Sequence, residues 1–170
     1  MLPISIRKLK KTDAASLSRL VLKIYDETSY ALTFSEKPNA LLLMDIFKSK
    51  LLLSKNNFLI DLVAVKGKKI IGECEIVLNE NNAVIGIIVE KKHRRKGVGK
   101  LLIDESIKKF RQISNKPIIA IISKENKTAL LFFKKCNFKT KIKEKSDTDE
   151  NYNYVTTSAP NGTNFTVFPE

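Results

Sequence analysis

The stretch NAVIGIIVEKKHRRKGVGKLLIDESIKKF, which spans Asn82–Phe110, decides the fold of this chain. It begins with a continuous apolar run, Ala83–Val89, of the kind found in buried strands. A charged link, Glu90–Lys96, follows. The next segment, Gly97–Phe110, carries apolar residues at helical spacing. The stretch therefore predicts a buried strand, a tight turn and an amphipathic helix in that order.

The turn Arg94–Gly99, RRKGVG, places three cations before two glycines at the predicted helix start. Because glycine has no Cβ, the backbone there can approach a ligand closely. The first helical N–H groups have no intrahelical acceptor, and the helix dipole favours an anion beside them. The turn therefore predicts a phosphate site, and a pyrophosphate would engage several N–H groups. A turn without a ligand remains the alternative, since the pattern is neither GxxxxGK[ST] nor GxGxxG.

Length and composition set wide limits on the kind of protein. A chain of 170 residues with 43% hydrophobic residues predicts a single domain, 1–170, in which 146–170 forms a tail or a last strand. The apolar runs are shorter than a membrane span and no N-terminal signal is evident, so we expect a cytoplasmic protein. Cys74 and Cys136 lack metal-ligand spacing and there is a single histidine, so we expect no metal.

The formal net charge of +13, from 31 basic and 18 acidic residues, is compatible with nucleic-acid binding. The lysines are dispersed, however, and few aromatic residues lie between them to stack on bases. We therefore favour a solvated lysine-rich surface, part of which faces an anionic cofactor.

Apolar spacing and turn residues predict the other elements. The predicted strands are Ile4–Arg7, Phe58–Val65, Lys69–Leu78, Ile118–Ile122, Phe138–Lys145 and Asn164–Phe168, with Ser146–Asn153 as a loop. The predicted helices are Ala14–Tyr25, one that opens at Pro38 and should bury Leu41, Leu42, Ile46, Leu52 and Leu53, and Asn126–Cys136, which should bury Ala129, Leu130, Phe132, Phe133 and Cys136. The order β-α-α-β-β-β-α-β-α-β-β mixes hairpins with helical crossovers, which predicts an α+β protein, or α/β in looser nomenclature.

Two motifs together resemble those of the GNAT family of N-acetyltransferases. One is the Arg-x-x-Gly-x-Gly turn within Val89–Leu102. The other is NKTALLFFKKCNF, Asn126–Phe138, which is similar to the family's Asn-x-x-Ala-x-x-x-Tyr-x-x-x-Gly-Phe. The resemblance extends from Ile4 to Phe138 and implies a mixed, mostly antiparallel sheet flanked by helices.

The resemblance implies that an acetyl group moves from acetyl-CoA to a primary amine on a small molecule, a peptide N-terminus or a lysine. We expect a monomer or homodimer with no membrane as partner, and the dispersed lysines disfavour nucleic acid as a partner. The backbone of Ile87–Val89 should meet the pantetheine, and one of its N–H groups should polarise the thioester carbonyl. The implied cofactor-binding residues are Ile87, Ile88, Val89, Arg94, Arg95, Lys96, Gly97, Val98, Gly99, Lys100 and Asn126.

The general base is not evident from the motifs. An alkyl amine is mostly protonated at neutral pH, so a group must accept its proton. Relatives place a glutamate early on the central strand, where this chain has Ala83–Ile85. Glu73 and Glu75 share one face of the preceding strand and are candidate bases, although a solvent-facing pair is the more common case for such an alternation. Glu80, Glu90 or a water molecule are alternatives.

Phe133 occupies the position of the family's tyrosine, a common proton donor to the leaving thiolate. A phenyl ring cannot donate, and Ser123, Tyr152 or Tyr154 could do so instead. Two alternatives to an enzyme therefore stay open. One is a catalytically weak CoA-binding module with a regulatory or interaction role, and the other is a basic nucleic-acid-binding protein.

Overall fold

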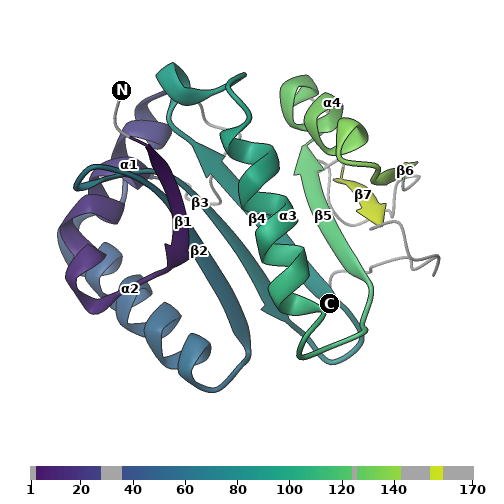
Figure 1. The fold of residues 1–170 in the computed structure, drawn as a ribbon, viewed down its shortest axis with the longest axis horizontal. Helices are drawn as coiled ribbons and strands as arrows, with labels where there is room; N and C mark the ends of the chain where they lie inside the picture. Colours follow the sequence, from purple (N-terminus) through teal and green to yellow (C-terminus); the bar gives the residue numbers. More distant parts are fainter. Residues whose placement is uncertain (1–2, 28–35, 124–125, 143–153, 159–170) are drawn as a thin grey trace. The chain divides into compact units, whose positions relative to one another are not determined.

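The computed structural model describes residues 3–27, 36–123, 126–142 and 154–158. Its elements follow the predicted order, and the fold is the predicted α+β arrangement with a mostly antiparallel sheet (Figure 1). The helices are α1 (Ala14–Glu27), α2 (Ala40–Lys55), α3 (Val98–Phe110) and α4 (Lys127–Lys135), and short 3₁₀ turns form at Lys11–Asp13 and Lys91–His93. The strands are β1 (Ile4–Lys8), β2 (Leu59–Lys66), β3 (Lys69–Leu78), β4 (Ala83–Val89), β5 (Ile118–Ser123), β6 (Lys139–Ile142) and β7 (Tyr154–Ser158).

The chain divides into two compact units. The first comprises Met1–Val77 and Ile87–Asn115, and the second comprises Leu78–Gly86 and Lys116–Glu170. The boundary falls within β4, so that strand contributes to both. Each unit is described separately below.

The strands of the first unit run in the order β1-β2-β3-β4. β1 pairs antiparallel with β2, and β2 pairs antiparallel with β3. Lys66 pairs with Lys69 across a two-residue turn whose first residue, Gly67, has φ 62°. A left-handed residue at that position suits a tight hairpin. A register shift between Ala64 and Val65 marks a β-bulge.

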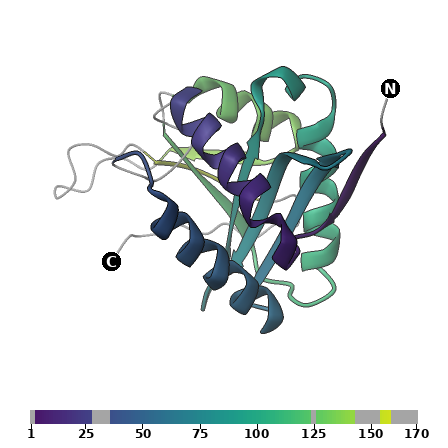
Figure 2. The same cartoon turned by 90° about the vertical axis from the view of Figure 1, so that its left-hand side faces the viewer.

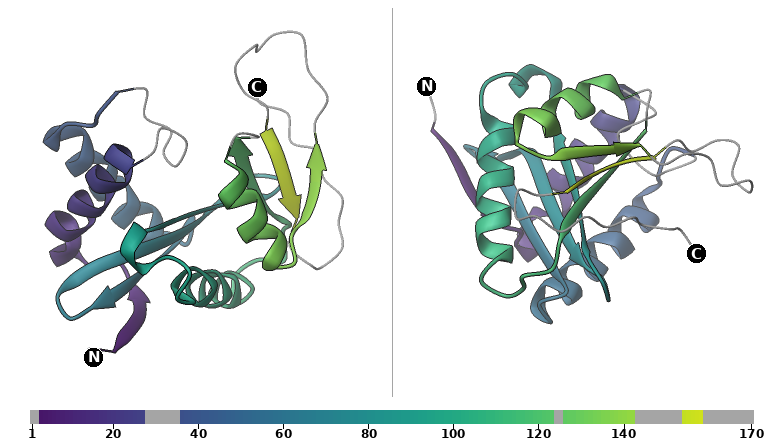
Figure 3. Two further views of the ribbon diagram at one scale, coloured as in Figure 1. Left: turned by 90° about the horizontal axis from the view of Figure 1, so that it is seen from above. Right: turned by 90° about the vertical axis from the view of Figure 1, so that its right-hand side faces the viewer.

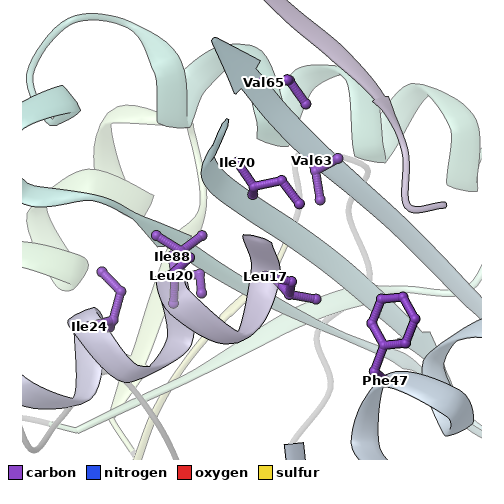
Figure 4. Packing of buried hydrophobic residues seen from close by; sticks show 8 residues of the cluster. All are labelled: Leu17, Leu20, Ile24, Phe47, Val63, Val65, Ile70 and Ile88. Atoms are coloured by element: carbon purple, nitrogen blue, oxygen red, sulfur yellow. The ribbon is translucent and has the colours of Figure 1, made fainter. Parts of the chain in front are cut away.

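Two helices cover one face of this sheet with an apolar cluster (Figure 4). α1 contributes a stripe of leucine and isoleucine at helical spacing, as the sequence predicts, and α2 contributes one phenylalanine. The strands contribute β-branched residues. The members of the cluster are Leu17, Leu20, Ile24, Phe47, Val63, Val65, Ile70 and Ile88.

The third helix of this unit lies on the other face, where β3 carries Gly72 (Figure 2, Figure 3). A Cβ at Gly72 would lie 3.0 Å from Leu102 Cδ1 of α3 and 3.1 Å from the Ile88 carbonyl oxygen. Leu102 is fully buried, and α3 also contacts β1 and β2. The absence of a side chain at Gly72 therefore sets how closely α3 approaches the sheet, and it positions the start of that helix.

The predicted buried face of α2 is wrong. Leu41, Leu42, Leu52 and Leu53 are exposed and Ile46 is half-buried, whereas Leu43 and Phe47 are buried. The helix starts at Ala40 rather than Pro38, with the Asn39 side chain accepting from the Leu42 N–H. Leucines lie on every side of this helix, so apolar spacing does not select a face. Lys50, which lies one turn beyond Phe47, selects it by contacting carboxylates of the sheet.

The second unit has the strand order β4-β5-β7-β6. β4 pairs parallel with β5 through Ala83–Ile118 and Val84–Ile119, and the Ala83 N–H donates to the Pro117 carbonyl at 2.8 Å. β7 is antiparallel to both β5 and β6. The helix of this unit, α4, contacts β7.

Several boundaries in the second unit differ from prediction. β6 spans Lys139–Ile142 within the predicted Phe138–Lys145, and β7 at Tyr154–Ser158 was not predicted. The predicted loop Ser146–Asn153 and strand Asn164–Phe168 lie outside the described residues. Of the residues predicted to be buried in the α4 segment, only Phe133 is fully buried, whereas Ala129, Leu130, Phe132 and Cys136 are half-buried.

We expect Gly72→Ala to destabilise the protein by about 1–3 kcal/mol, because an added methyl group cannot displace the Ile88 carbonyl without moving the backbone. Urea denaturation of the two proteins measures the difference. Adding Leu102→Val removes one of the clashing atoms, so the double variant should lose less stability than the sum of the single variants. An unchanged unfolding free energy in Gly72→Ala would show that α3 does not depend on this close approach.

Candidate functional site

The predicted phosphate-binding turn joins β4 to α3 within the first unit. After the 3₁₀ turn Lys91–His93, Arg94 is extended, Arg95 is left-handed at φ 61°, and Gly97 is left-handed at φ 82° as the N-cap of α3. Gly97 has no capping side chain, and its carbonyl accepts the Leu101 N–H at 3.0 Å. The first N–H groups of α3 therefore have no side-chain cap and remain available to an anion.

The surface of this turn is open and cationic. A Cβ built on Gly97 meets no atom within 4 Å, so the backbone there borders open space. Arg95 and Lys96 are exposed, and neither forms an ion pair with another of the described residues. Lys100, by contrast, is bonded to Asp104 at 2.8 Å. The open glycine and the two exposed cations fit a phosphate group, whereas the charge of Lys100 is shared with a carboxylate.

Arg94 is directed away from the open side of the turn. Its Nη2 donates to Glu27 Oε2 at 2.6 Å, and its Nε donates to the Val89 carbonyl at 2.7 Å. Both acceptors lie on regular elements, the end of α1 and the end of β4. The guanidinium predicted to face a cofactor is therefore occupied by protein groups.

Glu90, a predicted alternative base, lies at the centre of a second set of ion pairs. Lys23 donates to its carboxylate, Lys92 Nζ lies 3.4 Å from Oε1, and His93 Nε2 lies 3.4 Å from Oε2. Burial raises the pKa of Glu90, but the contacts with Lys23 and Lys92 together outweigh it and the net shift is downward. Burial lowers the pKa of His93. A carboxylate paired in this way is a poor base, and a buried neutral imidazole has a packing role.

A surface pocket of about 520 Å³ opens beside these residues. The β2–β3 hairpin and the segment after β4 line it with Lys66, Gly67, Lys68, Lys69, Ile71, Glu90, Lys92 and His93. None of the residues Arg95–Lys100 lines it, so it is separate from the glycine turn.

The strand end that should meet the pantetheine is partly open. Ile88 is buried in the cluster with α1, whereas Ile87 and Val89 on the opposite face are half-buried. The Glu90 N–H donates to the Ile71 carbonyl at 2.9 Å, which fixes the end of β4 against β3.

The candidate bases Glu73 and Glu75 lie beneath α2 with Lys50 between them. Lys50 Nζ is 2.9 Å from Glu73 Oε1 and 2.5 Å from Glu75 Oε2. The Glu73 side chain is 7% exposed and that of Glu75 is 36% exposed. The shared face predicted by their spacing is confirmed. That face is covered by a helix and neutralised by a lysine, which makes Glu73 inaccessible to an acceptor and leaves Glu75 accessible.

A third carboxylate, Asp61 on β2, completes the cluster. It is the register partner of Glu75, its Oδ2 lies 3.6 Å from Lys50 Nζ, and its side chain is fully buried. Sequence reasoning missed it, although the signal was present as a single acid within the apolar strand LIDLVAVK. Burial raises the pKa of Asp61 well above the usual value, and the neighbouring Glu73 raises it further.

The protonation of this cluster follows from its charge. Burial opposes the charged form of Lys50, but the three carboxylates outweigh it and raise the pKa of the ammonium. One lysine cannot neutralise three ionised carboxylates in a dry site. The raised pKa of Asp61 favours its protonated form, which reduces the excess negative charge, and burial likewise raises the pKa of Glu73.

The second unit holds the residues of the second motif. The Asn126 side chain accepts the Ala129 N–H at 3.1 Å, so it is the N-cap of α4. Phe133 is 3% exposed, and its ring packs edge-on against Phe138 at 5.0 Å and Phe132 at 5.6 Å. Asn137, at the family's glycine position, has φ 64°, the left-handed conformation that asparagine tolerates at the end of a helix.

Comparison with known proteins explains why these two motifs occur in one chain. The family model described as "Acetyltransferase (GNAT) family" matches residues 21–138, more than half of the sequence. The chain belongs to the GNAT acetyltransferase family. A comparison with curated proteins found no match.

Solved GNAT structures share the fold. The PaiA N-acetyltransferase of Thermoplasma acidophilum, in complex with coenzyme A, superposes with a TM-score of 0.75 at 19% identity, covering 93% of this chain and 99% of that chain. A Salmonella typhimurium acetyltransferase that modifies the N-terminal serine of ribosomal protein L7/L12 gives 0.75 at 12% identity, with coverages of 91% and 92%. A phosphinothricin acetyltransferase of Sinorhizobium meliloti, in complex with AcCoA, gives 0.70 at 16%, with coverages of 91% and 85%. At such identities the likeness concerns the fold.

Two further properties concern membrane-spanning helices and groups of metal-binding side chains. Within the described parts of the chain, no helix is long and apolar enough to cross a membrane. The described residues also contain no group of three or more His, Cys, Asp or Glu side chains that could hold a metal ion.

The raised pKa of Asp61 predicts how stability depends on pH. Above about pH 4 the unfolded chain releases the Asp61 proton while the folded protein retains it, so folding stability falls as pH rises toward the raised pKa. We expect the unfolding free energy of the wild type to fall relative to that of Asp61→Asn as pH increases from about 5 to 8, measured by urea denaturation. Asp45→Asn, an exposed position on α2, is the control and should follow the wild type. Parallel profiles for the wild type and Asp61→Asn would mean that Asp61 is ionised throughout.

Proposed function

We propose that this protein is an N-acetyltransferase that moves an acetyl group from acetyl-CoA to a primary amine. The observation that carries the proposal is the turn before α3, where a left-handed Gly97 borders open space beside exposed Arg95 and Lys96. Membership of the GNAT family supports the same donor.

In this proposal the backbone of Arg95–Lys100 binds the pyrophosphate of the donor through N–H groups that no side chain caps. Arg95 and Lys96 add charge at the exposed side of the turn. The backbone of Ile87–Val89 binds the pantetheine, and one of its N–H groups polarises the thioester carbonyl. Asn126 caps α4 and also contacts the donor.

The transfer requires a neutral amine. Its nitrogen bonds to the acetyl carbon, the carbon–sulfur bond breaks, and the amine proton passes to a base. Glu75 is the better placed of the two candidates, because its side chain is 36% exposed whereas that of Glu73 is 7% exposed. Lys50 holds both carboxylates, so a water molecule between Glu75 and the amine would carry the proton.

The leaving thiolate receives no proton from the side chain at position 133. Phe133 is packed between two aromatic rings and has no polar atom. A thiol with a pKa of about 8.5 leaves tolerably as the thiolate, so transfer can proceed without that donor. The absent donor together with the lysine-bound carboxylates favours one alternative, a CoA-binding module with little or no catalytic activity.

The acceptor stays open between a small molecule, a peptide N-terminus and a lysine side chain. The structurally similar enzymes act on acceptors as different as phosphinothricin and a protein N-terminal serine. A fold shared among such enzymes does not select one of these classes.

We expect Gly97→Val to abolish acetyl-CoA binding, because a β-branched residue is strained at φ 82° and its side chain would occupy the open space above the turn. Isothermal calorimetry with acetyl-CoA measures the affinity. Gly67→Val is the control, since it also places valine at a left-handed position but in the β2–β3 hairpin, and it should retain binding. An unchanged affinity in Gly97→Val would show that the donor does not bind at this turn.

The role of Glu75 is tested by comparing two variants in which a glutamate is replaced by glutamine. Glu75→Gln should lower kcat/KM by about 10²-fold or more, the usual cost of losing a positioned base, with the largest loss at low pH. Glu73→Gln, with its buried side chain, should change the pH–rate profile little once its effect on stability is measured. The readout is acetylation of peptides, polyamines and small amines across a pH series. If the wild type binds acetyl-CoA and acetylates none of them, the non-catalytic alternative holds.

A further inference from the structure

Two ion pairs of opposite polarity join the last turns of α1 to the turn before α3. Lys23 of α1 pairs with Glu90, and Glu27 of α1 pairs with Arg94 at 2.6 Å. Lys23 and Glu27 are four residues apart, so they lie on one face of the helix. Along the chain, this face of α1 carries a cation followed by an anion. The segment after β4 carries the complementary order, an anion followed by a cation. We call this arrangement the α1 brace.

Arg94 makes the brace more than a surface contact. Its guanidinium binds Glu27 through Nη2 and the Val89 carbonyl through Nε at 2.7 Å, so one rigid group connects the end of α1 with the end of β4. The Glu27 side chain is 16% exposed and the Arg94 side chain is 36% exposed. At this exposure the pair is screened less than a fully solvated one.

The backbone beside Arg94 needs such a restraint. Arg95 is left-handed at φ 61°, a conformation that costs free energy for a residue with a side chain. It persists where surrounding contacts determine it. Arg94 directly precedes this residue, and its side chain is fixed at both ends. The orientation of the N–H groups that follow therefore depends on the contact with Glu27.

We propose that Glu27 and Arg94 are positioning residues for the acetyl-CoA site, an inference that rests on the function proposed above. Arg94 acts by holding the turn in its binding conformation, and its side chain does not contact the phosphates. Exposed Arg95 and Lys96 supply the charge instead. Glu27, which lies outside both sequence motifs, determines donor affinity through Arg94.

A double-mutant cycle with Glu27→Ala and Arg94→Lys tests the brace. Lysine keeps the positive charge but cannot span both Glu27 and the Val89 carbonyl. Each single variant should weaken CoA binding in calorimetry by about tenfold, the scale of one charge-assisted hydrogen bond, and the double variant should weaken it no further. The KM for acetyl-CoA should rise in parallel, while kcat stays within about twofold.

Asp26→Ala is the matched control. Asp26 neighbours Glu27 on α1 and also pairs with a lysine, Lys37, but both side chains are more than half exposed. This variant should bind CoA as the wild type does. In ligand-free protein, hydrogen exchange of the His93 and Arg94 amides, which donate to Glu90 and Lys91, should accelerate in Glu27→Ala and not in Asp26→Ala.

Three results would overturn the proposal. Tighter CoA binding in Glu27→Ala with weaker binding in Arg94→Lys would make Arg94 a direct phosphate ligand that Glu27 holds back. Unchanged affinity in both single variants, with or without a lower Tm, would make the pair a purely structural contact. If the wild type itself does not bind CoA, the proposed function fails. Amide exchange then tests separately whether the α1 brace restrains the turn, and unchanged exchange in Glu27→Ala would show that it does not.

Discussion

The contact of Lys50 with three carboxylates of the sheet determines how the first unit is assembled. Moving a charged side chain from water into a dry site costs on the order of several kcal/mol per ion. The cluster is therefore stable only when its charged groups neutralise one another. Lys50 therefore cannot rotate away from Glu73 without leaving its own buried charge unpaired. This requirement fixes the rotation of α2 about its axis and brings Phe47 into the apolar cluster.

Sequence reasoning succeeded where local residues determine the structure, and it failed where the contacts of Lys50 determine it. Strands β3 and β4 were predicted with correct boundaries because turn residues flank them, with Gly67 before β3 and asparagines between β3 and β4. The left-handed conformation of Asn137 agrees with its residue type, because asparagine adopts that conformation more readily than most residues. The orientation of α2 could not be predicted, because its leucines surround the helix and the deciding partners of Lys50 lie on β2 and β3. Such long-range charge contacts leave no periodic signal along the chain.

The candidate site shows a similar division. Residue types and spacing predicted the glycine turn, since glycine and cations carry its chemistry locally. Arg94 contacts Glu27, which is far away in the sequence, and the backbone carbonyl of Val89, which any residue could supply. A sequence motif therefore reveals neither contact. Position 133 was correctly identified as a departure from the family, but its edge-on packing against Phe138 required coordinates.

The exposed leucines of α2 have a consequence for the behaviour of the protein in solution. Leu41 is 78% exposed and Leu52 is 61% exposed, so fixing this helix through Lys50 leaves apolar side chains in water. Such surfaces attract one another when copies of a protein meet. The net charge of +13 opposes that encounter by electrostatic repulsion. Because dissolved salt screens this repulsion beyond about 8 Å at physiological ionic strength, added salt should bring these leucines closer to association between copies of the protein.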